Sequence, residues 1–160
     1  MTAAIVLAGG RSSRLGRPKE DVVIGGRTLL ERTVDVCGGL DVVVVGPEAQ
    51  GGPVGALAAG LERVDAAEVL LLACDMPRVD ELVAALPPIP ARADAVVAVD
   101  RRRRQPLAGR YRVAALVGLE PGTSMRALLD RLTVVEVAVP EGCTDDVDTP
   151  ADLDRLGSPA

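Results

Sequence analysis

The chain has 160 residues, a length that suits one compact domain over residues 1–160. Apolar residues make up 48%, but a single Tyr is the only aromatic residue, so the core must be aliphatic. This scarcity of aromatic side chains argues against stacking on exposed bases, and the net charge of −5 argues against a nucleic-acid partner. The sequence contains no His, which excludes a Ser–His–Asp triad, a His-bound zinc ion and an imidazole base.

Three cysteines, Cys37, Cys74 and Cys143, form no CxxC pair, and their odd number argues against a disulfide framework. We interpret them as small buried thiols in a reducing compartment. The N-terminus lacks a basic region followed by a long apolar run, and no apolar stretch is long enough to cross a membrane. We therefore expect a cytoplasmic protein without a membrane partner. The one basic cluster, Arg101–Arg104, is typical of a solvated turn.

Short, Val-rich apolar runs recur along the chain and predict strands that are buried on both faces. These strands are Ala3–Leu7, Val42–Val45, Val69–Ala73, Ala95–Val99 and Val134–Val139, with Gln105–Tyr111 as a shorter, antiparallel candidate. Helix-like segments lie between them, at Leu29–Cys37, Val54–Val64, Glu81–Leu86, Ala114–Leu119, Ser124–Leu132 and Ala151–Leu156. The alternation predicts an α/β fold with a mostly parallel sheet and helices on both faces, and ligands collect at the carboxyl ends of such strands.

The first predicted strand runs into a Gly-rich loop that carries spaced cations. Gly9 and Gly10 let backbone NH groups come close to anionic oxygens. Hydroxyl donors and fixed positive charges follow at Ser12, Ser13, Arg14 and Lys19. The loop is neither a Walker A loop nor GxGxxG. A Gly turn followed by a solvated basic loop is the plain alternative, but the combination of features favours binding of a triphosphate.

The full pattern, L-A-G-G-x-S-S-R-x-G-x-x-K, resembles the signature of the sugar-nucleotidyltransferase-like superfamily. It is most similar to that of the molybdenum cofactor guanylyltransferase group, the MobA type. The resemblance implies a Rossmann-like, three-layer fold of the nucleotide-diphospho-sugar transferase kind. It also implies that Arg14 and Lys19 neutralise the phosphates of a nucleotide held by Leu7, Ala8, Gly9 and Gly10, with Ser12 and Ser13 as further ligands.

A second Gly-rich element, Gly52-Pro53-Val54-Gly55-Ala56-Leu57, resembles the Gly-Pro-Leu-x-Gly-Leu element of that family. Gly52, Pro53 and Gly55 would allow the backbone to approach a flat base, and a helix N-terminus follows. Without the resemblance, the element reads equally well as a turn and a helix start. The preceding segment, 46–51, is shorter than is usual in the family, so the choice between guanine and cytosine stays open.

Asp75 follows the predicted strand Val69–Ala73 within the sequence Cys-Asp-Met-Pro, which resembles the metal-binding Asp-x-Pro element of the family. A carboxylate at the end of a strand points into the cleft, and Mg²⁺ needs only one or two carboxylates together with phosphate oxygens and water. We expect Asp75 to hold Mg²⁺ or Mn²⁺. The alternative is an Asp that caps a helix or stabilises a turn.

The segment Gln105–Tyr111 resembles the acceptor-side Gln-Pro-Leu…Tyr segment of molybdopterin-type enzymes. Gln105 can hydrogen-bond the edge of a pterin, and neighbouring arginines can meet an acceptor phosphate. The resemblance implies acceptor-binding roles for Gln105, Pro106, Leu107 and Tyr111. Read by itself, the segment is simply a short edge strand.

The C-terminal run Asp145–Leu153 resembles the Asn-x-Asn-Thr-Pro-x-Asp-Leu element of the family, with aspartates where asparagines are common. Thr149-Pro150 predicts an N-cap followed by proline at the first helical position. Asp146 and Asp148 alternate along an extended stretch and could face the cleft together, Asp146 toward the acceptor. Asp148 is either a second metal ligand or a plain helix cap.

These motifs imply that an acceptor phosphate attacks the α-phosphorus of GTP, with Arg14, Lys19 and Asp75 as catalytic residues and molybdopterin as the acceptor. The acceptor is already anionic, so no general base is needed, which suits a chain without His. Relatives that use CTP with molybdopterin, or GTP with phospholactate, remain alternatives, as does a non-catalytic nucleotide-binding regulator. The resemblance also implies small-molecule substrates and transient contacts with other cofactor-biosynthesis proteins.

Overall fold

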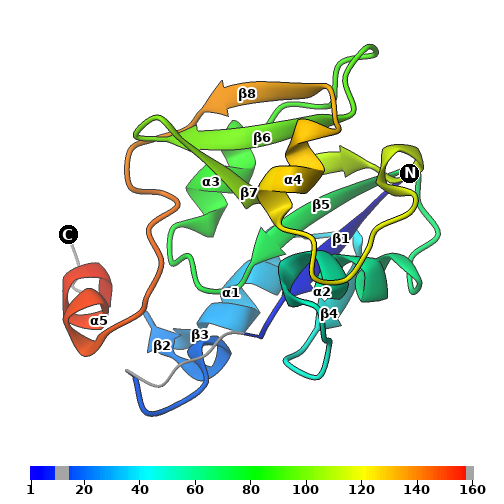
Figure 1. Ribbon diagram of the computed structural model, residues 1–160. Coiled ribbons are helices and arrows are strands. Elements are labelled where there is room, and N and C mark those ends of the chain that lie inside the picture. The colour runs from blue at the N-terminus through cyan, green and yellow to red at the C-terminus, as the bar shows by residue number, and fades with distance from the viewer. Residues whose placement is uncertain (10–14, 158–160) are drawn as a thin grey trace.

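A computed structural model describes residues 1–9 and 15–157, which contain a six-stranded sheet covered by helices (Figure 1). In chain order the strands are β1 Thr2–Leu7, β4 Asp41–Val45, β5 Glu68–Ala73, β6 Ala95–Asp100, β7 Arg103–Arg112 and β8 Val134–Ala138. Their order across the sheet is β4-β1-β5-β7-β6-β8. β7 is antiparallel to β5 and β6, and the other neighbours pair in parallel. The predicted α/β class and the antiparallel strand are therefore confirmed.

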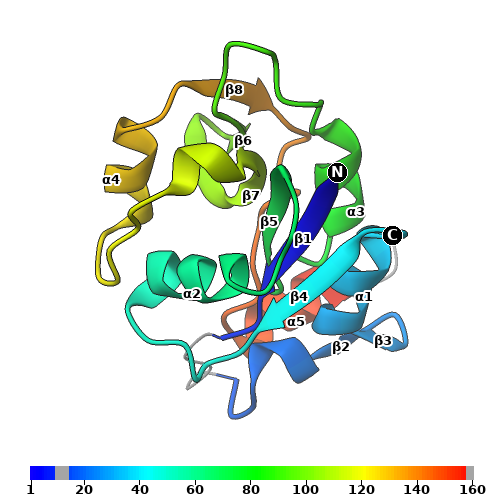
Figure 2. The same cartoon turned by 90° about the vertical axis from the view of Figure 1, so that its right-hand side faces the viewer.

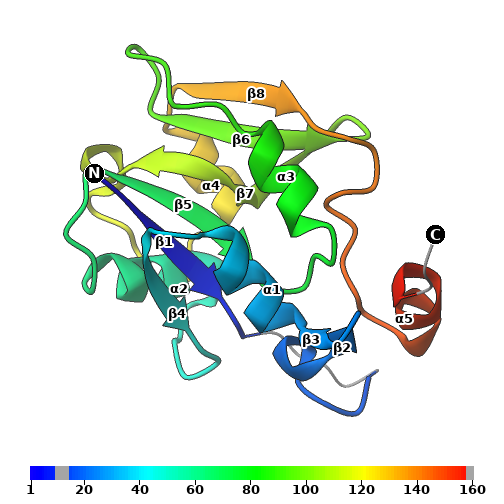
Figure 3. The same cartoon turned by 180° about the vertical axis from the view of Figure 1, so that it is seen from behind.

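Helices cover both faces of the sheet (Figure 2). On one face lie α1 Leu29–Val36 and α3 Val79–Ala85, and on the other lie α2 Gly52–Leu61 and α4 Met125–Asp130. The last helix, α5 Pro150–Gly157, lies beside a small hairpin rather than on the sheet (Figure 3). That hairpin consists of β2 Val23–Ile24 and β3 Arg27–Thr28, and it follows a short 3-10 turn, η1 Lys19–Asp21. Neither the hairpin nor η1 was predicted.

Two helix starts occur at the residues that the sequence predicted. At the start of α4, the Ser124 hydroxyl accepts a hydrogen bond from the Ala127 amide at 3.0 Å. At the start of α5, the Thr149 hydroxyl accepts one from the Asp152 amide at 3.2 Å, and Pro150 is the first helical residue. These bonds satisfy amides that have no partner within the helix.

The predicted helix Ala114–Leu119 is wrong. Only a 3-10 turn, η2 Val113–Leu116, forms there. Val117 is extended, with φ −71° and ψ 146°, and Gly118 has a φ of +69°. Because an α-helix needs several successive residues in helical conformation before its hydrogen bonds accumulate, this interruption prevents one from forming.

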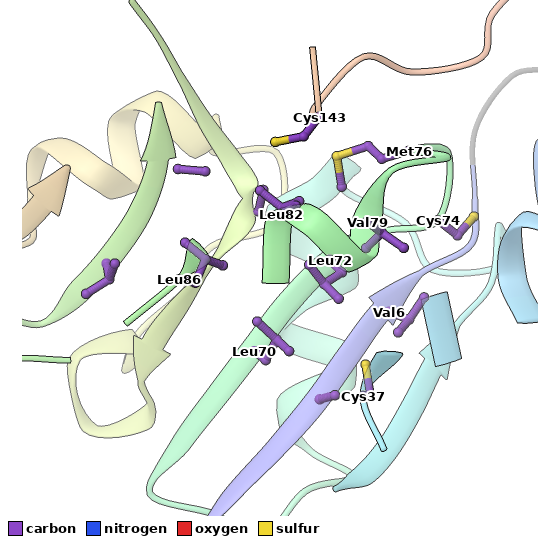
Figure 4. Close-up of a cluster of buried hydrophobic side chains, with 14 of the residues drawn as sticks. Val6, Cys37, Leu70, Leu72, Cys74, Met76, Val79, Leu82, Leu86 and Cys143 are labelled. Atoms are coloured by element: carbon purple, nitrogen blue, oxygen red, sulfur yellow. The ribbon is translucent and has the colours of Figure 1, made fainter. Parts of the chain in front are cut away.

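The core contains aliphatic and sulfur-bearing side chains. Figure 4 shows one layer of it, where strand residues such as Leu70 and Leu72 face Leu82 and Leu86. The three cysteines are free and buried, as the sequence predicted. Burial raises the pKa of the Cys37 thiol and of the Cys143 thiol to about 11, so both stay protonated at neutral pH. Within residues 1–9 and 15–157, no helix has the length and apolar composition to cross a membrane.

A small separate core lies under the hairpin. It contains Val22, Ile24 and Leu29, which are buried, together with the fully buried Val147 from the segment before α5. Leu15 and Leu153 pack against it. This cluster, which we call the hairpin core, joins the end of the N-terminal loop to the C-terminal segment, although the two are far apart in sequence.

Candidate active site

Two neighbouring cavities lie at the carboxyl ends of the parallel strands, where the sequence placed its motifs. The first has a volume of about 350 Å³ and lies among the ends of β1 and β4 and the start of α2. The second has a volume of about 570 Å³ and lies along β7 and the segment 144–146. Among the described residues, four line both cavities: Pro53, Ala73, Asp75 and Leu107. The two cavities therefore meet beside Asp75.

Most of the described residues that were predicted to bind the nucleotide line the first cavity: Leu7, Gly9, Lys19, Gly52 and Pro53. Gly10, Ser12, Ser13 and Arg14 lie outside the described residues. Two other predicted residues are placed behind the cavity wall. Ala8 is buried, and a Cβ at Gly55 would lie 1.9 Å from the Gln50 carbonyl oxygen. These two residues support the wall of the cavity instead of lining it.

Sequence reasoning missed the wall that β4 contributes to the first cavity. Gly46, Pro47 and Ala49, just after β4, line it. A Cβ added at Gly9 would come within 2.8 Å of the Pro47 Cα, so glycine at position 9 lets these two loops pack closely. The Gly-Pro pair at the end of a predicted strand was the available signal. Glu20, beside Lys19, also lines this cavity and was not predicted.

Lys19 lies at the centre of a cluster of carboxylates. Its Nζ is 3.3 Å from an oxygen of Asp75 and 3.7 Å from an oxygen of Asp146, and it donates a hydrogen bond to Asp148. Lys19 is 9% exposed. Burial lowers the pKa of Lys19, but the hydrogen bond to Asp148 and the three negative charges outweigh burial and raise the pKa above its usual value. The ammonium is therefore fully charged at neutral pH.

The carboxylates differ in how they titrate. Burial, a hydrogen bond with Asp148 and the nearby negative charge of Asp75 raise the pKa of Asp146 to about 6. The hydrogen bond from Lys19 holds the pKa of Asp148 below its usual value, against the opposing effect of burial. Asp146 and Asp148 lie on one side of the segment, since both carboxylates approach Lys19. They do not face the cleft together as predicted, because Asp146 lines the second cavity and Asp148 lines neither.

The segment that carries these aspartates is held in place from both sides. Val147 buries its side chain in the hairpin core, and its amide donates to the Asp75 carbonyl at 3.0 Å. Upstream, the buried Asp100 carboxylate accepts bonds from the Gly142 amide and from the amide and hydroxyl of Thr144, the last at 2.7 Å. Buried carboxylates require such partners. Asp100 therefore fixes the loop that leads to Asp146.

The second cavity receives most of the predicted acceptor residues: Gln105, Pro106, Leu107 and Asp146. An irregularity in the β6–β7 pairing lies opposite Pro106 and Leu107, where Val97 pairs with Gly109 but Ala98 pairs with Gln105. Proline cannot donate to a ladder, so an irregularity at this point is expected. Tyr111 does not line either cavity. It is fully buried, and its hydroxyl donates to the Pro106 carbonyl at 2.5 Å, so it supports the wall.

The carboxylates of Asp75, Asp146 and Asp148 are the donors present at the predicted metal site. Three carboxylates and one ammonium carry a net charge of −2 when all are ionised, which suits a divalent cation. The described part of the chain has no group of three or more Asp, Glu, Cys or His side chains arranged to hold a metal by themselves. Mg²⁺ would therefore need phosphate oxygens and water beside Asp75, which is its ordinary coordination. Asp148 lines neither cavity, and its carboxylate accepts a hydrogen bond from Lys19, which lines the first.

Comparison with known proteins agrees with this geometry. Residues 4–137 match the family model described as the MobA-like NTP transferase domain. A probable molybdenum cofactor guanylyltransferase of Nostoc sp. is 30% identical over 167 residues, covering 86% of this chain and 81% of the relative. A protein of the same description from Bacillus cereus is 32% identical over 134 residues, covering 68% of this chain and 67% of the relative.

Solved structures share the fold. The molybdopterin-guanine dinucleotide biosynthesis protein A of Archaeoglobus fulgidus has a TM-score of 0.67 at 20% identity, covering 98% of this chain and 97% of that chain. The 2-C-methyl-D-erythritol 4-phosphate cytidylyltransferase of Thermus thermophilus has a TM-score of 0.69 at 21% identity, covering 98% of each chain. These likenesses show the nucleotide-diphospho-sugar transferase fold, and the match over residues 4–137 shows the family. The chain belongs to the family of MobA-like NTP transferases.

Proposed function

We propose that the chain transfers GMP from GTP to the phosphate of molybdopterin, or of its molybdenum form, and releases pyrophosphate. The observation that carries this proposal is the meeting of the two cavities at Asp75. Transfer between two bound substrates requires their reacting groups to be adjacent, and holding them in line supplies much of the rate enhancement. The names of the relatives from Nostoc sp. and Bacillus cereus support guanine and a molybdenum cofactor.

The first cavity suits the nucleotide. Its walls are apolar or backbone at Leu7, Gly46, Pro47 and Ala49, which fits a flat base and a ribose. Lys19 lines this cavity beside Asp75. When a triphosphate binds, the Lys19 ammonium can therefore exchange its carboxylate partners for phosphate oxygens. A fixed positive charge beside the reacting phosphate stabilises the charge that builds up in the transition state.

The second cavity suits the acceptor. At about 570 Å³ it has the size of a site for a drug-sized molecule, which favours a pterin over a three-carbon phospho-acid. Gln105 supplies donors and an acceptor for the edge of the ring. The acceptor phosphate is the nucleophile, and it is ionised at neutral pH, so these residues need only to orient it. Asp75, with Asp148 as a second candidate, would hold a Mg²⁺ or Mn²⁺ ion that neutralises phosphate charge.

A non-catalytic regulator with the same fold is disfavoured by the residues present. A protein that only sensed nucleotide would not need a buried Lys19 beside Asp75, or a second cavity next to the first. The three free, buried cysteines support the reducing cytoplasm as the location of the protein.

The test is pyrophosphate release from the purified protein with Mg²⁺, molybdopterin and each of GTP, CTP, ATP and UTP in turn. We expect pyrophosphate release with GTP and with none of the other three nucleotides. Release with CTP instead of GTP would show that the protein is a cytidylyltransferase. Release with GTP and phospholactate, but not with GTP and molybdopterin, would show that the acceptor is the phospho-acid. Binding of GTP in a thermal-shift panel without release in any combination would favour the regulator, because binding alone raises apparent stability.

A further inference from the structure

The turn between β6 and β7 places arginines where the backbone favours glycine. Asp100 pairs with Arg103 across the ladder, so Arg101 and Arg102 form a two-residue hairpin turn. Their φ angles are +47° and +65°. Turns with positive φ at both positions usually take Asn-Gly or Gly-Gly, because this conformation is unfavourable for a residue with a Cβ. The positive φ angles of Arg101 and Arg102 therefore cost conformational stability.

Arg101 in this turn and Arg103 at the start of β7 both line the second cavity, and they differ in their partners. Arg101 is engaged: its guanidinium bonds to Asp145 at 2.6 Å and to Glu141 at 3.3 Å, which ties the turn to the segment before Asp146. The Arg103 side chain has no hydrogen bond or ion pair with any residue of the described ranges, and it lines the same cavity. Arg104 lines neither cavity and pairs with Glu136 at 2.5 Å. Among the described residues, Arg103 thus brings a guanidinium without a bonded partner to the cavity wall.

The second cavity runs along β7, and its outer end holds Arg101 and Arg103 together with two carboxylates that already have partners. Asp145 pairs with Arg101, and Asp100 accepts hydrogen bonds from Thr144 and Gly142. The inner end of the cavity holds Asp75 and Asp146, and Leu107 there lines both cavities. Arg103 lies four positions away on the same strand, on the order of 10 Å along it. Gln105 lines the wall between them. Under the proposed function the attacking phosphate lies at the inner end beside Asp75, which leaves the Arg103 guanidinium available for a different anion at the outer end.

We propose that Arg103 binds a second anionic group of the acceptor, an oxyanion or a carboxylate that is separated from the attacking phosphate by an uncharged body lying along Gln105. This inference rests on the proposed function, because it assigns the second cavity to the acceptor. A guanidinium forms two parallel bonds to such an anion, which fixes its orientation as well as its position. Arg103 is then a residue that selects acceptors with charge at both ends.

The first experiment needs no turnover. Protein saturated with GTP and Mg²⁺ is treated with the arginine reagent phenylglyoxal, with and without inorganic phosphate, and modification is followed by mass spectrometry. Arg102 is the matched control, since it is an exposed turn residue that lines neither cavity. Phosphate should slow modification of Arg103 several-fold and leave Arg102 unchanged. If phosphate does not slow modification of Arg103, or slows modification of Arg102 equally, the proposal is overturned.

The second experiment measures kinetics with GTP and molybdopterin. Arg103→Gln should raise the KM for the acceptor about 10-fold or more, and leave the KM for GTP unchanged. Arg104→Gln, on the opposite side of the same strand, should change neither. An unchanged acceptor KM in Arg103→Gln would contradict the proposal. If the wild type does not use molybdopterin although phosphate protects Arg103, the proposed function fails and the anion site stands.

Discussion

The amide of Val147 donates a hydrogen bond of 3.0 Å to the carbonyl of Asp75. Val147 separates Asp146 from Asp148, and its side chain is fully buried in the hairpin core. One residue therefore links the carboxylate at the junction of the two cavities to the two carboxylates that reach Lys19 from the C-terminal segment. The distance between these charges depends on how firmly Val147 is packed.

Val147→Ala should lower kcat by more than its effect on stability explains. Loss of two buried methyl groups costs roughly 1–3 kcal/mol of unfolding free energy, and it also loosens the segment of Asp146 and Asp148. Val69→Ala is the matched control. Val69 is as buried as Val147, but it lies at the amino end of β5, away from Asp75, which follows the carboxyl end. Urea unfolding and steady-state rates at a temperature where both variants are folded separate the effects. Equal kcat values in the two variants would show that Val147 only fills space.

Lys19→Met should lower kcat/KM for GTP by at least ~10-fold, the equivalent of about 1.4 kcal/mol. Methionine keeps an apolar stem of similar length but removes the ammonium that lies among Asp75, Asp146 and Asp148. Circular dichroism and thermal unfolding monitor the fold, and Lys19→Arg should restore part of the rate. A smaller loss, in a folded variant, would mean that Lys19 only balances the carboxylates.

Asp100→Asn should destabilise the fold in a pH-dependent way. Burial tends to raise the pKa of Asp100, but hydrogen bonds from Thr144 and Gly142 outweigh it and lower the pKa below its usual value of 3.8. A carboxyl with a lowered folded-state pKa stabilises the protein above its unfolded-state pKa, and that contribution disappears as the pH falls through the folded-state pKa. Wild type should therefore exceed Asp100→Asn in stability at pH 7 and pH 5, and the difference should narrow below about pH 4.

Unfolding free energies from urea titrations at each pH give this comparison. Thr144→Val, which removes only the hydroxyl donor to Asp100, should lose a smaller part of the same stability. A difference between wild type and Asp100→Asn that stays constant down to pH 3 would contradict the prediction.

Gln105→Ala should leave GTP affinity unchanged and weaken use of molybdopterin. Gln105 lines the second cavity and not the first, and an unmade hydrogen bond to a buried polar edge costs about 1–3 kcal/mol. Separate titrations of GTP and molybdopterin against wild type and variant measure the two effects. Equal weakening of both ligands would assign Gln105 to structural support of β7.

The strands and most helices could be predicted from the sequence because periodicity is local. β1, β4 and β5 are short Val-rich runs, and their carboxyl ends had to meet at one edge once the sheet was parallel. That reasoning placed Asp75 and Gln105 near one another correctly. It failed at Ala114–Leu119, where the positive φ of Gly118 ends a segment of helix-like composition.

Other parts of the site depend on contacts between residues far apart in sequence. Lys19 was assigned to phosphate, and its contacts with Asp146 and Asp148, more than a hundred residues away, could not be read from spacing. Tyr111 belongs to the acceptor motif, yet its hydroxyl donates a hydrogen bond to the Pro106 carbonyl inside the wall of the second cavity. Asp100 belongs to no recognisable sequence motif. Its role could not be predicted, because its hydrogen-bond donors lie about forty residues away, at Gly142 and Thr144.

The most direct test of the account follows the α-phosphorus itself. GTP labelled at the α-phosphate is incubated with Mg²⁺, molybdopterin and either wild type or Asp75→Asn, with Asp65→Asn, a change at an exposed residue, as the control. We predict that wild type and Asp65→Asn move the label into the acceptor and release unlabelled pyrophosphate. Asp75→Asn should remain folded and transfer almost none. Label that stays in GTP or appears in GMP or GDP with wild type, or full transfer by a folded Asp75→Asn, would contradict the account.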